Sequence, residues 1–433
     1  MNSFGTLFRI TLWGESHGPQ IGVTLDGVPA GLPLDIPDFE ADLARRRSGA
    51  KGTTPRQEND LPQIVSGLYK GHTTGAPLTL VFENANTRSG DYDNLLTQPR
   101  PSHADRTAAV KFEGWNDPRG GGHFSGRLTL ALVAAGVVAK KILGGATFST
   151  RLTAVGGQTD PARFDDAIDD ALRDEDSVGG IVECRVAGIP AGWGEPFFDS
   201  VESAAAHLLF AIPAIKGVEF GDGFAAAALR GSAHNDPIAD ADGRTATNHA
   251  GGIAGGITNG NELVVRAAVK PTASIAREQQ TFDFAAGRVA PLRIRGRHDA
   301  CIALRAAVVV EAAMAVALAG GKPADVKERA VMPEREITTW MLSDDERAAV
   351  EAAVMAVAGG ESSLCQQAAA QAIRNTCEDY GMSVSQVLTE WQYPSNSNVS
   401  DDVKDAVSYV IDYKAVNERL HCFYNPAVQD GTW

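Results

Sequence analysis

Two long apolar segments constrain the fold of this chain more than any other feature of its sequence. They cover about residues 128–143 and 302–319, where apolar side chains follow one another almost without interruption. Two lysines interrupt the first segment, and Arg305 and Glu311 interrupt the second, so we interpret both as helices of a protein core rather than membrane spans. A helix without a polar face must be covered by other elements of the fold.

The chain is long enough to supply that cover. It has 433 residues, 44% of them hydrophobic. Because a single hydrophobic core rarely extends beyond about 250–300 residues, we expect one large domain and a smaller one.

Charge excludes some partners and favours others. The formal net charge is −15, which argues against nucleic acid or an anionic membrane surface as a general partner. Between residues 45 and 127, however, twelve Lys and Arg stand against eight Asp and Glu. A local excess of positive charge in an acidic protein suits a small polyanion better than a polymer.

The densest group of reactive side chains lies just before the first apolar segment. It consists of Arg100, His103, Arg106, His123 and Arg127, together with three consecutive glycines at 120–122. The arginines can hold anions and the histidines can move protons. Glycines let the backbone approach a ligand closely, and the N–H groups at a helix start attract negative charge. This pattern predicts a site for an anion that must react.

Strands and helices are expected along the rest of the chain. Alternating or apolar runs predict strands at 7–13, 21–25, 64–68, 77–83 and 262–269, and amphipathic patterns predict helices at 38–47 and 201–210. His17 follows the first strand in a glycine-flanked turn, where a lone histidine is usually only solvated. Residues 147–184 are predicted to be a variable region, whose acidic run at 165–176 forms a surface helix and loop.

Two loop segments have the composition of a phosphate site. The helix at 38–47 ends in three arginines and continues into a Gly/Thr-rich basic loop at 48–56, which is typical either of a solvated helix end or of a lid over a phosphate. A glycine-rich segment at 248–260 matches neither a P-loop nor a dinucleotide-binding fingerprint. Beside Lys270 and Ser274, it nevertheless offers backbone donors, a cation and a hydroxyl to a phosphate.

Asp299 has two interpretations. It lies close enough to the second apolar helix to cap its N-terminus, and it is also a carboxylate beside Arg297 and His298. The pattern leaves both open.

Cysteines and the N-terminus bear on the compartment. Five cysteines, at 184, 301, 365, 377 and 422, show neither a CxxC pair nor ligand-like spacing, which predicts buried free thiols in a reducing compartment and no metal site. The first residues show no charged region followed by an apolar stretch, so we expect no signal peptide and a cytoplasmic protein.

Seven short motifs resemble those of the chorismate synthase family, in the family's order and approximate spacing. They are GESHG at 14–18, RPSHAD at 100–105, GGG and SGR within 120–127, IKGVEFGDGF at 215–224, NHAGGI and GGI within 248–257, KPT at 270–272, and RHD with a following cysteine at 297–301. Each motif alone is modest, but seven in register rarely arise by chance. The resemblance covers about residues 4 to 333.

The resemblance implies a carbon–oxygen lyase that converts 5-enolpyruvylshikimate 3-phosphate to chorismate and phosphate by an anti-1,4 elimination, the last step of the shikimate pathway to the aromatic amino acids. It implies reduced FMN as cofactor, although the reaction has no net redox change. The implied fold is α+β, a layer of helices sandwiched between two antiparallel-rich β-sheets, with the two apolar helices in the middle. A homotetramer with flavin sites shared between subunits is expected.

Site residues follow from the motif positions. By similarity, His17 and His103 handle protons at the flavin and the departing phosphate, and Asp299 works with the flavin in removing the ring proton. The substrate carries two carboxylates and a phosphate, which arginine forks suit best. The expected substrate contacts are Arg46, Lys51, Arg56, Arg100, Ser125, Arg127 and Arg297. The expected FMN contacts are His123, Phe124, Ser125, Pro213, Ala214, Gly255, Lys270, Pro271, Thr272, Ala273, Ser274 and Arg297.

Three places depart from the family pattern. Many relatives have Arg-Ser-Ser where this chain has His-Phe-Ser at 123–125, Asn where it has Pro213, and Arg where it has Lys51. Proline has neither an N–H nor a side-chain amide, so a polar flavin contact there would pass to a carbonyl or be lost. Two other interpretations therefore stay open: a flavoprotein of this fold that acts on another phosphorylated acid, and a non-catalytic binding or assembly protein.

Residues 334–433 lie beyond the resemblance and are predicted to form a mainly helical extension, with helices at 343–359, 361–381 and 401–420. Some relatives reduce their own flavin with NADPH, so an appended reductase is conceivable. Because the extension has no phosphate-binding glycine loop, we expect a packing or interaction appendage instead.

Overall fold

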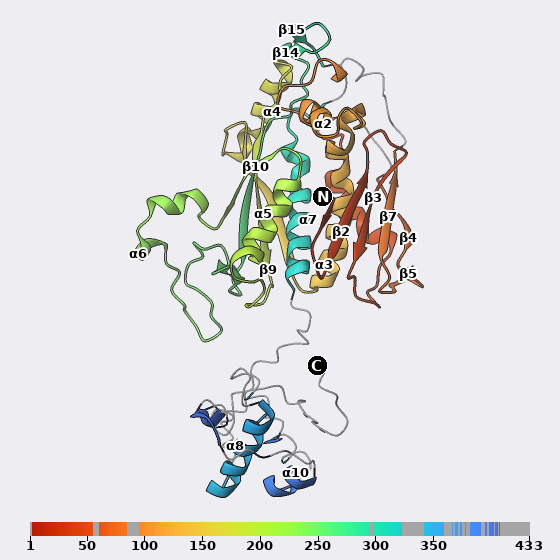
Figure 1. Cartoon of the computed structure of the whole chain (residues 1–433). Helices are drawn as coiled ribbons and strands as arrows, with labels where there is room; N and C mark the ends of the chain where they lie inside the picture. Colours follow the sequence, from red (N-terminus) through yellow and green to blue (C-terminus); the bar gives the residue numbers. More distant parts are fainter. Residues whose placement is uncertain are drawn as a thin grey trace. The chain divides into compact units, whose positions relative to one another are not determined.

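We describe the protein from a computed structural model (Figure 1). The structure describes residues 2–54, 60–84, 95–294, 298–322, 342–358 and 382–390, and single positions and short runs between 366 and 407. Two compact units divide the chain, Met1–Val326 and Lys327–Trp433. The domain boundary that the sequence places after residue 333 stays a prediction.

The first unit contains a five-stranded antiparallel sheet near its N-terminus. In spatial order its strands are β1 (Ser3–Phe4), β2 (Arg9–Gly14), β3 (Gln20–Asp26), β7 (Leu78–Glu83) and β4 (Gln63–Ser66). Ile21 pairs with Phe82, and Val23 pairs with Leu80, and all four side chains are buried. Because side chains alternate between the two faces of a strand, these pairs place one apolar face of the sheet against the core.

A second antiparallel sheet has four strands. Their spatial order is β10 (Ile215–Phe220), β13 (Leu263–Val269), β9 (Gly180–Ala187) and β8 (Thr147–Val155). The surface helix expected in the 147–184 region is present as α4 (Phe164–Arg173), and the region also supplies β8 and the start of β9, two strands that the sequence analysis did not predict. Charged residues in these strands interrupt the apolar alternation from which strands are predicted.

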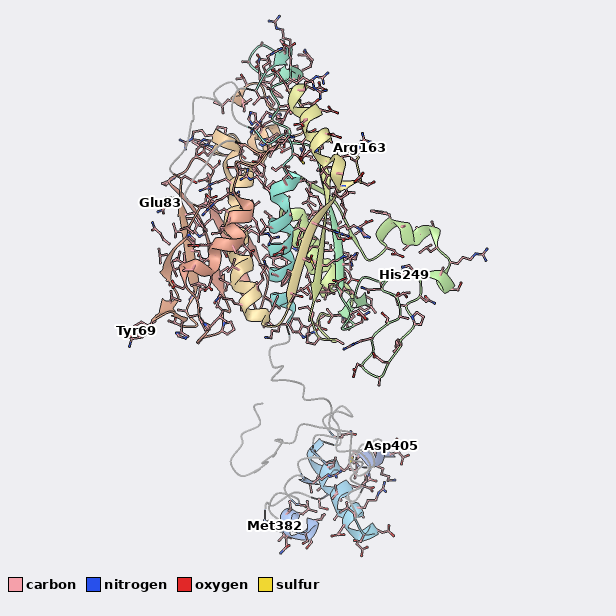
Figure 2. All side chains as sticks on the ribbon, turned by 180° about the vertical axis from the view of Figure 1, so that it is seen from behind. Tyr69, Glu83, Arg163, His249, Met382 and Asp405 are labelled. Carbon is pink, nitrogen blue, oxygen red and sulfur yellow. The ribbon has the colours of Figure 1, made fainter. Side chains whose placement is uncertain are left out.

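Those charges pair across the second sheet. Glu183 on β9 accepts hydrogen bonds from Arg151 at 3.0 Å and from Arg185 at 2.9 Å, and its carboxylate lies 3.7 Å from Arg266 on β13. Arg151 and Arg266 contact Glu183 from neighbouring strands that are distant in sequence, so the pattern of a single strand does not reveal these stabilising cross-strand pairs. Figure 2 shows the two sheets on opposite sides of the first unit, with Tyr69 and Glu83 marking one side and Arg163 and His249 the other.

A layer of helices lies between the sheets, which confirms the expected sandwich (Figure 1). It contains α1 (Glu40–Arg46), α3 (Thr129–Leu143), α5 (Val201–Ala211) and α7 (Ala303–Gly321). α3 packs against β2, β3 and β7, α7 packs against β8, β9 and β13, and the two helices pack against each other. The most apolar window of α7 is 78% buried, so this helix belongs to the core, as its charged residues indicated.

The charged residues that interrupt the two apolar helices bind each other. Glu311 of α7 is 2% exposed and its carboxylate accepts hydrogen bonds from both Lys140 of α3 and Arg45 of α1, the latter at 2.7 and 2.8 Å. Asp42 of α1 also accepts from Lys140 at 2.6 Å. A buried carboxylate is tolerated when cations and hydrogen bonds compensate it, so this network fixes three helices of the layer relative to one another.

Shorter elements complete the first unit. They are β5 (Leu68–Tyr69) with β6 (His72–Thr73), β11 (Ile253–Ala254) with β12 (Ile257–Thr258), the hairpin β14 (Gln279–Asp283) and β15 (Arg288–Leu292), and the helices α2 (Asp105–Lys111) and α6 (Gly231–His234). Short 3-10 helices in the described connections are Ile36–Phe39, Arg119–Phe124, Gly126–Leu128, Pro161–Arg163, Phe197–Asp199 and Gly223–Ala228.

The second unit is helical where the structure describes it. Its helices α8 (Asp344–Ala358) and α10 (Val384–Glu390) share a core with other buried residues, including Val350, Val354, Ile373, Val387 and Val403. The helix predicted at 343–359 is thereby confirmed, whereas most of those predicted at 361–381 and 401–420 lies outside the described residues. This unit therefore has a hydrophobic cluster of its own.

Candidate active site

A cavity of about 610 Å³ in the first unit brings together segments that are far apart in the sequence. Its walls come from the N-terminal residues, the loops before α2 and α3, the turn between α5 and β10, and the segments after β13 and before α7. The predicted site residues that line it are Arg100, His103, His123, Phe124, Ser125, Pro213, Ala214, Lys270, Thr272, Ala273, Ser274 and Asp299. Volumes of this order are usual for ligand and cofactor sites.

The triple glycine lies between the two histidines that the motifs singled out. All three glycines have positive φ, between 53° and 84°. A Cβ on Gly120 would lie 2.1 Å from Cε1 of the buried His17, and a Cβ on Gly121 would lie 3.3 Å from Cε1 of His103. Glycine is therefore required at 120 both for its backbone conformation and for the space that the His17 ring occupies. His17 does not line the cavity, but Gly120 does.

Arg100 and His103 are held by a tight turn. The His103 amide donates to the Arg100 carbonyl at 3.2 Å, with Pro101 and Ser102 between them. Ser102 has φ of 57°, so the turn is of type II with a serine where glycine is favoured. The Arg100 guanidinium donates to Ser274 Oγ at 2.9 Å, which joins this turn to the segment after β13.

Asp299 lines the cavity and does not cap α7. The helix has Ile302 at its N-cap, with no side-chain cap, so the capping interpretation is wrong. The Asp299 carboxylate instead accepts from the Thr54 amide at 2.9 Å and pairs with Arg305 at 3.2 Å. Its side chain is almost fully buried, and these two partners fix its orientation in the cavity wall.

Two of the predicted substrate arginines are buried behind the cavity wall. Arg46 donates to the Gly126 carbonyl at 2.7 Å and to Thr129 Oγ1 at 3.0 Å. Burial lowers the pKa of Arg46 to about 9. Arg127 pairs with Asp60 and donates to Asn84 at 3.1 Å. Both arginines are therefore engaged in holding the loop before α3, whose Ser125 side chain accepts from the Arg127 amide at 3.3 Å.

The side of the cavity predicted to hold flavin carries unpaired polar groups. Within the described residues, Thr272 Oγ1 is buried without a hydrogen-bond partner, and neither Lys270 nor Lys216 pairs with a carboxylate. Burial, and the nearby charge of Lys216, lower the pKa of Lys270. Ala214, at φ of 79°, accepts from the Lys270 amide at 2.9 Å, which keeps this wall together.

Some predicted residues lie elsewhere. Lys51 pairs with Asp169 at 2.7 Å on the surface, and both side chains are about half exposed. Gly255, in the β11–β12 turn, and Pro271 are not among the lining residues. Arg56 and Arg297 lie outside the described residues. The roles predicted for these four positions and for Lys51 stay predictions.

Other lining residues were not predicted by sequence reasoning. They include His207, Lys216, His298 and Phe4. Lys216 and His298 lie inside motifs that had been recognised, so their place in those motifs was an available signal. His207 lies on α5 and packs edge-on against Phe4 at 5.1 Å between ring centroids, and no local pattern marks either residue.

Comparison with known proteins identifies the family. The family model described as chorismate synthase matches residues 8–321. A chorismate synthase of Chitinophaga pinensis is 61% identical over 320 residues, which are 74% of this chain and 96% of that protein. One of Chloroflexus aurantiacus is 45% identical over 346 residues, which are 73% of this chain and 94% of that protein. This chain belongs to the chorismate synthase family.

A solved structure supports the same assignment. Described as "Crystal Structure of Chorismate Synthase", it aligns with a TM-score of 0.56 and 26% identity, covering 73% of this chain and 92% of that one. The prediction of a chorismate synthase from seven motifs is confirmed, and with it a phosphate lyase of the last shikimate-pathway step. The match to the chorismate synthase model ends at residue 321, before the second unit begins.

Proposed function

We propose that the cavity binds 5-enolpyruvylshikimate 3-phosphate together with reduced FMN. The observation that carries the proposal is the convergence of Arg100 and His103, Lys270, and Asp299 on one cavity from three separate parts of the chain. Among the described lining residues, Arg100, Lys216 and Lys270 supply positive charge and Asp299 is the single carboxylate. An excess of cations suits two polyanionic ligands.

The residues of the flavin side fit an anionic cofactor. Lys270 and Lys216 have no carboxylate partner within the described residues, and Thr272 Oγ1 is a buried hydroxyl with unused hydrogen-bonding capacity there. Buried polar groups are normally satisfied, so groups left over in a cavity wall favour a bound ligand. We propose that these three side chains, with His123 and Ser274, hold FMN. When bound, reduced flavin supplies electron density to the breaking C–O bond.

Proton handling falls to the histidines and Asp299. The elimination removes a proton from one ring carbon and breaks the C–O bond to phosphate, so that the C–H electron pair ends in the new double bond. Asp299, oriented by Thr54 and Arg305, is proposed to act in removal of the ring proton. His103, at the cavity wall, is proposed to protonate the departing phosphate. His17 adjoins the cavity through Gly120 and is proposed to serve the flavin side.

Arg100 is proposed as a direct substrate contact, because it lines the cavity. Arg46 and Arg127 do not line the cavity, so they are proposed to add positive potential from behind its wall. Lys51, Arg56 and Arg297 remain proposed contacts on the strength of the family pattern, as do Gly255 and Pro271 for FMN. A homotetramer, a cytoplasmic location and a non-reductase role for the second unit belong to the same proposal.

An anaerobic assay tests the proposal. Purified full-length enzyme, chemically reduced FMN and 5-enolpyruvylshikimate 3-phosphate are mixed, and chorismate and phosphate are followed together. We expect both products in equal amounts, with kcat reduced by about 10²–10⁴-fold in His103→Ala and in Asp299→Asn. His72→Ala, an exposed histidine on β6, serves as control and should retain wild-type activity. Absence of both products while substrate and flavin still bind would refute the proposal.

A further inference from the structure

We propose that Asp105 is a positioning residue that fixes the ring proton of His103 on Nδ1, so that Nε2 is the nitrogen that exchanges a proton in the cavity. The inference rests on the proposed function of His103. It assigns to Asp105, which does not line the cavity, a task that neither the motif nor the cavity lining reveals.

The backbone brings the two side chains together. The type II turn at 100–103 reverses the chain, and Asp105 follows two residues later at the start of α2. The His103 Nδ1 atom lies 2.6 Å from Asp105 Oδ1, and the Asp105 side chain is 9% exposed. The contact is therefore short and screened from water.

The proton on that contact must belong to the imidazole. Burial alone would raise the pKa of Asp105, but hydrogen bonds from Arg100 and His103 hold that pKa well below its ordinary value, so the group is a carboxylate. A carboxylate only accepts, and a bare imidazole nitrogen also only accepts. A separation of 2.6 Å between them requires a proton, which places it on Nδ1.

Arg100 locks the carboxylate in place. Its Nε donates to Asp105 Oδ2 at 2.7 Å, its Nη2 donates to Oδ1 at 2.7 Å, and its backbone amide donates to Oδ2 at 3.0 Å. Such a two-pronged pair fixes direction as well as charge. Arg100 Nη2 also lies 3.1 Å from His103 Nδ1. Since a guanidinium cannot accept a proton, it cannot replace Asp105 as the partner of Nδ1–H.

The remaining nitrogen is directed away from this network. Nε2 lies on the side of Gly121, where even an added Cβ would be 3.4 Å away, at van der Waals distance, and His103 itself lines the cavity. With Nδ1 committed to Asp105, Nε2 accepts a proton when the ring is neutral and donates one when the ring is charged. In other acid–base sites, a carboxylate that accepts a hydrogen bond from an imidazole orients the ring in the same way.

Imidazole nitrogen NMR on histidine-labelled full-length enzyme tests the proton's position directly, with His103→Ala identifying the signal. We expect Nδ1–H for neutral His103 in the wild-type protein and a shift of population toward Nε2–H in Asp105→Asn, whose amide can donate to Nδ1. Asp222→Asn is the matched control. Asp222 pairs with His249 at 2.7 Å outside the cavity, and its loss should leave the His103 signal unchanged (Figure 2 labels His249).

Kinetics on the same variants separate positioning from general structural support. Asp105→Asn should lower kcat by about 10²-fold and change KM by less than about threefold, because the proton donor rather than substrate binding is affected. A wild-type spectrum with the proton on Nε2 would overturn the proposal whatever the variants do. An Asp105→Asn enzyme with raised KM and unchanged kcat would also overturn it, since Asp105 would then act only through Arg100. Full activity in His103→Ala would instead refute the proposed function, while the spectrum would still decide the tautomer.

Discussion

At Gly136 the two core helices approach each other closely, and the replacement of this residue tests the packing of the middle layer. A Cβ added there would lie 2.4 Å from Cβ and 2.6 Å from Cα of Ala312 on α7. Carbon atoms in contact prefer about 3.5–4.0 Å, so α3 and α7 would have to separate by roughly 1 Å in Gly136→Ala. Neither neighbour is a flexible side chain that could move aside.

Two opposing terms set the expected change in the free energy of unfolding. Overpacking of a dense core costs about 1–3 kcal/mol. Alanine in place of glycine in a helix returns about 1 kcal/mol. We therefore expect a net loss of up to about 2 kcal/mol, the difference of the two. The matched control is Gly320→Ala in α7, where the nearest atom to the new Cβ is the Phe8 carbonyl oxygen at 3.8 Å. The control should be neutral or slightly stabilising.

Urea unfolding of the full-length chain, followed by far-ultraviolet circular dichroism, measures both variants against the wild type. The two substitutions have the same chemistry, so a difference in sign isolates the helix–helix contact. If Gly136→Ala were as stable as Gly320→Ala, the close approach of α3 and α7 would not exist in solution.

Four further perturbations follow from particular contacts. Burial would raise the pKa of Glu311, but hydrogen bonds and charges from Arg45 and Lys140 hold that pKa at about 2. The stability that the Glu311 carboxylate contributes is therefore complete above its ordinary pKa of 4.5 and is lost as pH falls toward 2. Glu311→Gln should cost about 3–5 kcal/mol of unfolding free energy at neutral pH and flatten that acid dependence in urea titrations. Ser102→Gly should stabilise the protein by about 1 kcal/mol in the same assay, because φ of 57° strains a serine. Gly120→Ala should displace the His17 ring and lower kcat by about 10²-fold in the anaerobic assay. Deletion of residues 327–433 should leave the elimination activity intact, because the family match ends at 321.

For three of these perturbations, a particular result would contradict the reasoning. An unchanged acid slope in Glu311→Gln would mean that the carboxylate is solvated. Gly114→Ala introduces the same kind of backbone strain, at φ of 83°, with nothing within 4 Å of its Cβ. Equal losses of activity at 114 and 120 would mean that displacement of the His17 ring is not the cause. Loss of chorismate formation on deletion of the second unit would assign that unit a part in catalysis.

Local sequence patterns predicted much of the architecture. The apolar runs at 128–143 and 302–319 became α3 and α7, and alternating runs became β2, β3 and β7. These predictions succeed because burial on one face leaves a period in contiguous residues, and burial on all faces leaves a continuous apolar run. β8 and β9 were missed, because charged pairs across the second sheet replace the apolar pattern on one face.

The candidate site also has features that the sequence predicted and features that only the structure shows. Motif order identified the family, and the family pattern predicted site roles for His103, Asp299 and Lys270, all three of which line the cavity. The sequence could not say which charged groups face that cavity. Arg46 lies behind the wall and Lys51 on the surface, although both belong to the same basic stretch.

What the sequence by itself determined is therefore the family, its chemistry and the elements whose burial is periodic. Only the tertiary structure showed that Glu311 pairs with Lys140 and that Asp105 contacts His103. It also showed that Asp299 accepts from Thr54 and pairs with Arg305 rather than capping a helix. The physical reason is distance: electrostatic and hydrogen-bond energies depend on ångströms between atoms. Glu311 and Lys140, like Asp299 and Thr54, belong to segments more than a hundred residues apart.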